Sequence, residues 1–479
     1  MTAANPYDES VRALDRVHEL AREYVRDLPN RRVGRLLETD ELTDAFDEPL
    51  PEHSSDPVAA IEDWFKRADP GIVASPGPRF FGFVVGGATP AALAGDWLAS
   101  AIDQNGGLWP ASPASAVTEL AVIRWLKELF GLPSAWVGVL TSGATMANLV
   151  GLAAARQWAG RQLGFDPAVD GLGGHPPIPV LSSQAIHSSA VKALGNLGLG
   201  RSSVRKVAAP GGEVNLAAFE KELEQLDGPV IVIANAGEVN TGQFDKIDAI
   251  ADLCQLHPGG AWLHVDGAFG LFAAASPGLQ YLVAGIERAD SVASDGHKWL
   301  NVPYDCGFAF VRDESALRAT FSAKGPYTAG SAGWDADDFS PDMSRRFRGL
   351  AAWCALKAYG RDGYRALVER CVENATAFAS WVDETPGLEL MNAERVRQSP
   401  LNCVCFRFTP AGLEPEATNA FNRAAVAAIQ DDGRAFVTGT VWEGKAAIRA
   451  AFDNWATTLA DVEILESVAD DVGAKLHTT

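Results

Sequence analysis

From about residue 80 onwards, short apolar runs alternate with stretches of helical periodicity. The apolar runs are rich in valine and isoleucine, and they cover residues 136–140, 178–182, 229–235, 261–266, 290–294 and 307–311. Strand–helix alternation of this kind predicts an α/β fold, in which helices on both faces sandwich a mostly parallel sheet. In such sheets ligands bind at the carboxyl ends of the strands. The residues that directly follow each apolar run are therefore the candidate site residues.

The chain has 479 residues, which is too long for one compact core, so we expect two or more structural units. We assign 1–77 to an N-terminal helical arm, 78–350 to a large domain and 351–479 to a small C-terminal α+β domain. Within the arm, helices are expected at 8–27 and 57–68, separated by a proline-rich acidic stretch. Helices that cannot bury their apolar faces alone often pack on another subunit, so we expect a homodimer.

The formal net charge of −21 disfavours nucleic acid and anionic membranes as partners, because both attract clustered lysine and arginine. No apolar run is long enough to span a bilayer. The polar, acidic N-terminus does not have the pattern of a secretory signal. These features favour a cytoplasmic protein that acts on a small molecule.

The six cysteines stand in mostly apolar or strand-like surroundings, and none forms a C-x-x-C pair. This pattern predicts reduced, buried thiols. Metal binding by Cys403 and Cys405 is a weaker alternative, since no second cluster is present to complete a site. We therefore expect no metal.

The first strand end reads TSGAT, residues 141–145, and leads directly into a helix. Backbone N–H groups at a helix start, with hydroxyl groups beside them, form an anion site. A threonine or serine in this position also serves simply as a helix cap. His187 follows the second strand at another helix start, where it is either a cap residue or a catalyst.

Three further strand ends carry polar side chains, namely Asn235, Asp266 and Lys298. A carboxylate at the end of a buried strand is costly unless it is paired, and the small residues Gly267 and Ala268 leave room beside it for something flat. Lys298 lies in SDGHKWLN, and on its own it would be read as a surface lysine in a turn.

One edge of the expected sheet thus collects an anion-binding helix start, an imidazole, a carboxylate and a lysine. Pyridoxal phosphate requires a lysine for its Schiff base, an acidic partner for its pyridinium nitrogen and a phosphate pocket. An imidazole can stack on its ring. Each feature is weak alone, but their common location predicts this cofactor.

The motifs AIHSSAVKA (185–193), HVDGAFG (264–270) and GHKWLNVPYDCG (296–307) carry a resemblance to a known family. The chain resembles the group II pyridoxal-phosphate-dependent amino acid decarboxylases, which have the aspartate aminotransferase fold, also called fold type I. The resemblance runs from about 78–101 to about 345–363 and continues more weakly to the C-terminus.

The resemblance implies a role for each matched position. Lys298 holds the cofactor as an internal aldimine, and Asp266 pairs with the pyridine nitrogen. His187 stacks on one face of the ring, and Ala268 packs against the other. The remaining implied cofactor-binding residues are Gly143, Ala144, Thr145, His297 and Asn235. Phe83, Trp109 and Trp334 are implied to line the substrate pocket, which in this family lies at a dimer interface with residues donated across it.

The sequence departs from the family pattern at several positions. Glu238 and Val239 stand where relatives often have a threonine pair, and Asp295 replaces an asparagine. Relatives carry a loop tyrosine that protonates the intermediate, whereas residues 328–343 contain none and Tyr327 precedes them. Three arginines follow this loop, namely Arg345, Arg346 and Arg348. They suit either the binding of an acidic substrate or contacts with the loop or with another subunit.

The function implied by the resemblance is decarboxylation of an L-amino acid to the corresponding amine and carbon dioxide. Two alternatives exist on the same fold, namely decarboxylation-dependent aldehyde synthesis and carbon–carbon cleavage. A non-enzymatic binding protein is a third possibility, disfavoured because the cofactor positions are intact. Aromatic residues near the expected pocket suit an apolar side chain, but the sequence does not identify the substrate.

Overall fold

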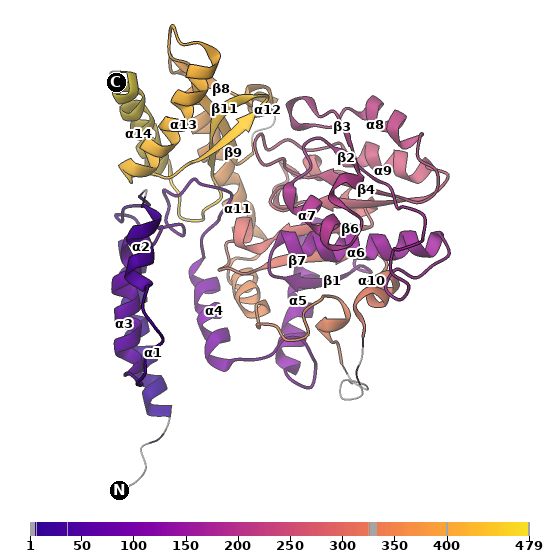
Figure 1. Ribbon diagram of the computed structural model, residues 1–479, viewed down its shortest axis with the longest axis horizontal. Coiled ribbons are helices and arrows are strands. Elements are labelled where there is room, and N and C mark those ends of the chain that lie inside the picture. The colour runs from indigo at the N-terminus through magenta and orange to yellow at the C-terminus, as the bar shows by residue number, and fades with distance from the viewer. Residues whose placement is uncertain are drawn as a thin grey trace.

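Figure 1 shows the computed structural model, with the N-terminal arm on the left, the large domain on the right and the small C-terminal domain above. The structure describes residues 5, 7–35, 37–323, 325, 333–398 and 401–477. The seven-stranded main sheet has the order β1-β7-β6-β5-β4-β2-β3. Its strands are β1 (Val137–Thr141), β2 (Val180–Ser183), β3 (Val204–Val207), β4 (Val230–Asn235), β5 (Ala261–Asp266), β6 (Ser291–Asp295) and β7 (Gly307–Val311).

Strands β2 to β6 pair in parallel, and β7 is antiparallel to both of its neighbours, β1 and β6. The mostly parallel sheet expected from the sequence is therefore confirmed, and each of the six apolar runs forms a strand. β3 was not expected, because VRKV has two exposed residues and lies at the sheet edge. Since β1 and β6 both oppose β7, their carboxyl ends meet at the same edge as those of β4 and β5.

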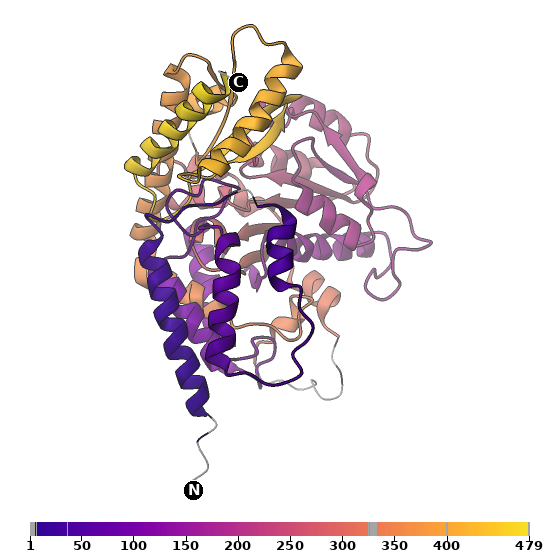
Figure 2. The same cartoon turned by 60° about the vertical axis from the view of Figure 1, so that its left-hand side comes forward.

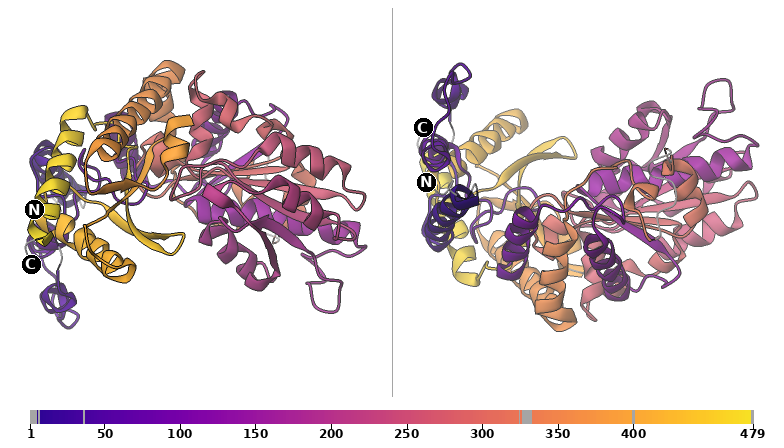
Figure 3. Two further views of the ribbon diagram at one scale, coloured as in Figure 1. Left: turned by 90° about the horizontal axis from the view of Figure 1, so that it is seen from above. Right: turned by 90° about the horizontal axis from the view of Figure 1, so that it is seen from below.

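Both faces of the main sheet are buried, which explains its continuous apolar strands. In β4, for example, Val230 and Val232 belong to one hydrophobic cluster, and Ile231 and Ile233 belong to the other. Helices cover these faces, as the views along the sheet in Figure 3 show. They are α5 (Pro113–Phe130), α6 (Ala144–Gln162), α7 (Ser188–Asn196), α8 (Leu216–Leu223), α9 (Ile247–Leu256) and α10 (Glu314–Phe321). Helix α4 (Pro90–Ile102) packs instead against the long helix that begins at Gly349.

The long helix α11 (Gly349–Glu384) leads from the large domain into a four-stranded antiparallel sheet of order β10-β11-β9-β8. These strands are β8 (Leu388–Leu390), β9 (Cys403–Phe408), β10 (Thr438–Trp442) and β11 (Lys445–Ala451). The helices of this region are α12 (Ala393–Gln398), α13 (Pro415–Asp432) and α14 (Leu459–His477). An α+β C-terminal unit is as expected, while the domain boundaries at 77/78 and 350/351 stay predictions.

The arm holds α1 (Tyr7–Asp27), α2 (Thr39–Phe46) and α3 (Pro57–Ala68). The two expected helices are confirmed, and α2 is an additional one. None of these helices has a buried residue, and Figure 2 shows them standing in front of the rest of the chain. The apolar faces of the arm are thus largely uncovered within one chain.

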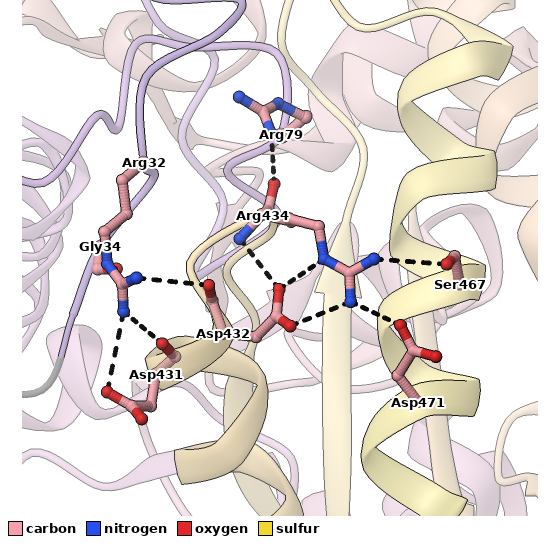
Figure 4. A network of polar contacts seen from close by, with 8 residues as sticks. All are labelled: Arg32, Gly34, Arg79, Asp431, Asp432, Arg434, Ser467 and Asp471. Atoms are coloured by element: carbon pink, nitrogen blue, oxygen red, sulfur yellow. Dashed lines mark hydrogen bonds and ion pairs between the residues drawn. The ribbon is translucent and has the colours of Figure 1, made fainter.

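Polar contacts from Arg32 of the arm and from Arg79, just after the arm, reach the small domain (Figure 4). Arg79 donates to the carbonyl oxygen of Arg434 at 2.9 Å, and the guanidinium of Arg434 pairs with Asp432 and Asp471. Arg32 donates to the carbonyl oxygen of Asp431. The arm is therefore fixed to the end of α13, although its helices extend away from the core. No helix in the described ranges is long and apolar enough to cross a membrane.

Candidate active site

The lysine of SDGHKWLN lies directly beyond β6, in a single π-helical turn at Gly296–Leu300. Lys298 interrupts this turn with non-helical angles, φ −91° and ψ −108°. The neighbouring indole of Trp299 is 0% exposed and anchors the turn in the core. Asn301, at φ 55°, donates to the carbonyl oxygens of Lys298 at 3.2 Å and Trp299 at 3.1 Å. The buried Trp299 side chain and the amide of Asn301 thus both hold the backbone of Lys298 in place.

The amine of Lys298 faces an acidic and an aromatic group. Its Nζ lies 3.4 Å from Oδ2 of Asp295 and 5.6 Å from the centre of the Phe269 ring. The side chain of Lys298 is only 18% exposed. The amine is therefore largely withdrawn from solvent, unlike that of a surface lysine in a turn.

Asp266 ends β5 and is almost fully buried, with 5% of its surface exposed. Its Oδ2 accepts a hydrogen bond from Nδ2 of Asn148 at 2.9 Å, and its Oδ1 accepts from the backbone N–H of Ala268 at 3.2 Å. Two donors thus stabilise the buried carboxylate. Because Asp266 can only accept when ionised, the amide nitrogen of Asn148 must face it, which leaves Oδ1 of Asn148 for another partner.

That partner is His264, whose Nε2 lies 2.8 Å from Oδ1 of Asn148. Burial lowers the pKa of His264 to about 4, so its ring is neutral and carries one hydrogen. This hydrogen is on Nε2, and Nδ1 then accepts from the hydroxyl of Ser291 at 2.8 Å. Trp262 donates to the same hydroxyl at 2.9 Å. A buried chain of donors therefore ends on the carboxylate of Asp266.

His187 caps helix α7, as one of the two readings of the sequence predicted. Its Nδ1 accepts from the backbone N–H of Ser189 at 3.3 Å and lies 2.7 Å from the hydroxyl of Ser189. That hydroxyl accepts from Asn148 at 3.2 Å. Since Nδ1 is an acceptor, the ring hydrogen of His187 is on Nε2. Asn148 thus donates both to Asp266 and to the serine that contacts His187. His187 can therefore cap α7 and belong to the site at the same time.

The start of α6 lies beside the end of β6. Gly143 precedes the helix at φ 140°, and a Cβ on it would lie 3.2 Å from Cε1 of His297. The backbone N–H of Ala144, which the sequence assigned to phosphate, donates to Oδ1 of Asp295 at 2.5 Å. Asp295 also lies 3.5 Å from Nε2 of His297. A carboxylate thus occupies one donor of the expected anion site, while Thr145 follows in the same helix turn.

His297 stacks on Tyr304, with ring centres 4.4 Å apart. Its Nδ1 is buried and has no hydrogen-bond partner among the described residues. Burial lowers the pKa of His297, and the nearby Lys298 acts in the same direction. A neutral imidazole with a free buried nitrogen is therefore available beside Gly143 and the start of α6.

A cavity of about 770 Å³ opens between the large and small domains at this edge. Lys298, His187, His297 and Phe83 line it, together with the tip of the β10–β11 hairpin at 440–443. The hairpin is attached to the large domain, because Thr440 donates to Oδ1 of Asn240 at 2.6 Å. The structure therefore brings the lysine, both imidazoles and one predicted pocket aromatic around a single space.

Other predicted residues lie elsewhere. Asn235 is not among the described residues that line the cavity; its amide donates to Ser183 at 3.0 Å and to Asp245 at 3.2 Å. Trp109 and Trp334 are also outside it, in neighbouring loops of the large domain. The backbone N–H of Trp109 donates to Asp335 at 2.7 Å, and the ring of Trp334 stacks on Phe339 with centres 5.6 Å apart. Tyr327 falls outside the described residues.

The structure also shows where the side chains that differ from the family pattern, or follow its loop, are placed. Glu238 is buried and accepts from the backbone N–H groups of Asn240 at 2.9 Å and Thr241 at 2.8 Å, so it stabilises its own turn. The three arginines after the loop all form ion pairs within the chain. The pairs are Arg345 with Glu119, Arg346 with Asp96 and Arg348 with Asp305. These guanidinium groups therefore hold the fold, and they are not arranged to bind an acidic substrate.

Sequence reasoning missed several residues of the site. Asn148 was hidden in the apolar helix pattern of α6, although it is a polar side chain one turn after Ala144. His264 lies two positions before Asp266 on β5 and therefore shares its face, which is a signal the sequence does contain. Arg449 and the 440–443 hairpin come from the small sheet, whose placement against the large domain no local pattern reveals.

The cysteines are free, and five of the six are buried. Burial raises the pKa of both Cys403 and Cys405 to about 12, so these thiols stay protonated near neutral pH. Metal ligation requires the thiolate, so the high pKa disfavours metal binding by Cys403 and Cys405.

Comparison with known proteins places this chain in a family. The chain matches the pyridoxal-dependent decarboxylase conserved domain over residues 40–409. It is 29% identical to an aromatic-L-amino-acid decarboxylase of Bacillus atrophaeus, over 93% of this chain and 91% of that protein. It is 27% identical to a phenylacetaldehyde synthase of Arabidopsis thaliana, over 84% and 83% of the two chains. The crystal structure of Oryza sativa TDC with PLP and tryptamine matches with a TM-score of 0.89, at 24% identity and 99% coverage of both chains.

The fold is that of a fold type I protein, and the matched family model identifies pyridoxal phosphate as the cofactor. More particularly, the chain belongs to the pyridoxal-dependent decarboxylase family. It is therefore a carboxy-lyase that decarboxylates an amino acid with this cofactor, as the sequence led us to expect.

The residues present suit the cofactor in most respects. Lys298 supplies an amine at the cavity, Asp266 a buried carboxylate, and His297 a buried nitrogen with no partner among the described residues. A side chain at Gly143 would crowd His297 and Asp295, so only glycine keeps the space at the start of α6 open. Asp295 is the exception, because its negative charge lies where a phosphate is expected.

Proposed function

We propose that this chain decarboxylates an aromatic L-amino acid. The cavity beside Lys298 carries the proposal, because Phe83 of the large domain and Val441 and Trp442 of the β10–β11 hairpin contribute apolar side chains to its lining. The ion pairs of Arg345, Arg346 and Arg348 argue against an acidic substrate. The names of relatives such as the Bacillus atrophaeus enzyme support the same substrate class.

In this proposal Lys298, Asp266 and His187 would hold the cofactor, with the lysine as its anchor, the carboxylate as the partner of its ring nitrogen and the imidazole beside its ring. Pyridoxal phosphate, when bound, supplies the electron sink that accepts the electrons released with carbon dioxide. The chain contributes position and charge. Asn148 holds Asp266 as an acceptor, and Ser189 fixes the ring of His187 with Nε2–H available. Partial burial of the Lys298 side chain limits the contact of its amine with water.

A screen for amine release tests this function. The cofactor-loaded protein is incubated with each common amino acid, and amine and carbon dioxide are measured together. We expect turnover of tryptophan, tyrosine or phenylalanine that exceeds turnover of glutamate by at least about a hundredfold, because only an aromatic side chain would bury the apolar surface that Phe83, Val441 and Trp442 contribute. Comparable rates with glutamate would contradict the proposed substrate class.

A second candidate is an aldehyde synthase, favoured by the absence of tyrosine from residues 328–343 and by the likeness to the Arabidopsis thaliana enzyme. That reaction consumes one oxygen and one water and forms aldehyde, carbon dioxide, ammonia and hydrogen peroxide. The same screen distinguishes the two, because a decarboxylase releases amine without consuming oxygen. Peroxide in equal amount to carbon dioxide would select the synthase.

We further propose a homodimer in which Trp109 and Trp334 approach the partner subunit's site. Two observations support this. Both residues lie outside the cavity of their own chain, and large apolar side chains are exposed on the arm and on α4 and α5. These include Val11, Leu14, Trp64, Trp97, Leu98, Val117 and Leu120. The free cysteines support the reducing cytoplasm as the place of action.

A further inference from the structure

A second cavity, of about 590 Å³, lies between the large and small domains. It is lined by residues within 210–216 and 241–246 of the large domain and within 391–398 of the small domain. The hairpin residues Trp442 and Glu443 line both this cavity and the active-site cavity. None of the described residues assigned above to the cofactor lines the second cavity. Its volume is in the range of sites that bind small molecules.

Arg395 of α12 lines this cavity and forms no ion pair in the described part of the chain. It is 9% exposed, and its Nε donates to the carbonyl oxygen of Gly242 at 3.2 Å. Its Nη2 is buried and has no partner among the described residues. Burial lowers the pKa of Arg395 to about 10, so the guanidinium stays charged near neutral pH. A buried charge without a counter-ion is costly, so an anionic group in the cavity would stabilise it.

Gln243 gives the same cavity a buried acceptor. Its Nε2 donates to Oε2 of Glu213 at 2.8 Å, which fixes the orientation of the amide because a carboxylate only accepts. Its Oε1 is then a buried acceptor with no partner among the residues that the structure describes. Gln243 directly follows Gly242, whose carbonyl oxygen holds Arg395. One short segment therefore positions both the guanidinium and the unpartnered acceptor.

The other charged side chains of the lining decide which kind of ligand fits. Lys246 and Glu213 pair with each other at 3.3 Å. Glu394 and Glu443 add two further acidic side chains. These acids disfavour an anion with several charges, such as phosphate, because like charges repel. A ligand with one negative and one positive group suits the cavity better, since it can use the guanidinium of Arg395 and the acceptors together.

We propose that this second cavity binds a free α-amino acid in its zwitterionic form, at a site separate from the active site. The forked guanidinium of Arg395 binds the carboxylate, and Oε1 of Gln243 accepts from the ammonium group. Because Trp442 and Glu443 line both cavities, the bound amino acid lies beside the hairpin that also lines the active site. Such binding does not depend on which amino acid the active site decarboxylates.

Calorimetric titration of the cofactor-loaded enzyme after borohydride reduction tests this site. The reduced cofactor cannot bond to an added amino acid, so the titration measures binding and not turnover. The probes are the common L-amino acids, each titrated separately. We expect at least one of them to bind to the wild type. Arg395→Gln should weaken that binding by at least about tenfold, because charged hydrogen bonds to the carboxylate are lost.

Arg397→Gln is the matched control, because Arg397 lies on the same helix but is exposed, pairs with Asp383 at 3.0 Å and does not line the cavity. Its Kd should equal that of the wild type. The absorbance of the bound cofactor before reduction should also be the same in Arg395→Gln and the wild type, since Arg395 does not line the active-site cavity. If Arg395→Gln folds poorly, Arg395→Lys keeps the charge, loses the fork and should still weaken binding.

Gln243→Met tests the ammonium side of the site. The wild type should prefer the bound amino acid to its hydroxy-acid analogue, which lacks the ammonium group, and Gln243→Met should reduce that preference by at least about threefold. Equal binding by Arg395→Gln and the wild type would overturn the proposal, as would the absence of binding by every amino acid. Displacement of the amino acid by inorganic phosphate, with no preference over the hydroxy acid, would also overturn it, because the cavity would then be a simple anion site.

Discussion

Nζ of Lys298 lies 3.4 Å from Oδ2 of Asp295, whose other oxygen accepts the first N–H of helix α6 at 2.5 Å. A negative charge thus stands between the lysine and the helix start expected to bind phosphate. Like charges disfavour one another at this range. Relatives usually have asparagine at this position, so we expect the carboxylate of Asp295 to oppose binding of the cofactor phosphate.

Asp295→Asn should bind pyridoxal phosphate about tenfold more tightly, which corresponds to roughly 1.4 kcal/mol. The amide keeps an oxygen for the N–H of Ala144 but removes the charge that opposes phosphate. Spectroscopic titration of the protein with cofactor measures the Kd. Asp290→Asn is the control, because Asp290 stands at the opposite end of β6 and pairs with Arg312. Weaker binding in Asp295→Asn would show that the carboxylate helps to hold the cofactor.

Asn148→Ala should lower the free energy of unfolding by about 2–3 kcal/mol and weaken cofactor binding. The change leaves His264 without its acceptor and Asp266 without a side-chain donor, both in buried positions. Urea unfolding and the cofactor Kd measure the two effects. Asn422→Ala removes a comparably buried amide in the small domain and should destabilise without changing the Kd. Unchanged binding in Asn148→Ala would contradict the support proposed for Asp266.

The pH dependence of stability should carry a contribution from His264. Its pKa falls from about 6.5 in the unfolded chain to about 4 in the folded one. The unfolded state therefore binds the proton first, and up to roughly 3 kcal/mol of stability is lost as pH falls from 6.5 to 4. His264→Asn should remove this contribution, so the stability difference between wild type and variant should shrink toward pH 4. A difference independent of pH would contradict the neutral ring.

The arm should control assembly. Leu14 is 56% exposed on α1, and replacing it with glutamate places a charge on an apolar face that the single chain leaves uncovered. Leu14→Glu should shift the protein from dimer to monomer in sedimentation experiments. Leu256→Glu, at an exposed position at the end of α9, should leave the dimer intact. A Leu14→Glu protein that stays dimeric would exclude this face of the arm from the interface.

Much of the large domain was predictable because its strands are buried on both faces, which makes them continuous apolar runs. Strand ends meet at one edge of a parallel sheet, so the sequence alone predicts that Asp266 and Lys298 lie at the same edge. The same rule places His187 at this edge, although the sequence alone does not decide between a helix cap and a site residue.

The rest of the site depends on contacts that no local pattern encodes. Asn148 is one polar residue in an apolar helix, and only the packing of α6 on β5 shows that it meets Asp266. Arg449 reaches the cavity because the small sheet docks there. Trp109 and Trp334 have no place in the cavity of their own chain, so their predicted role depends on a second subunit.

Covalent labelling of the cofactor site tests the central claim most directly. The protein is loaded with pyridoxal phosphate, reduced with borohydride, digested and mapped by mass spectrometry. The proposed function requires that the reduced cofactor is found on Lys298, and that Lys298→Ala retains neither the label nor amine release. Label on a different lysine, or full turnover by Lys298→Ala, would contradict the account.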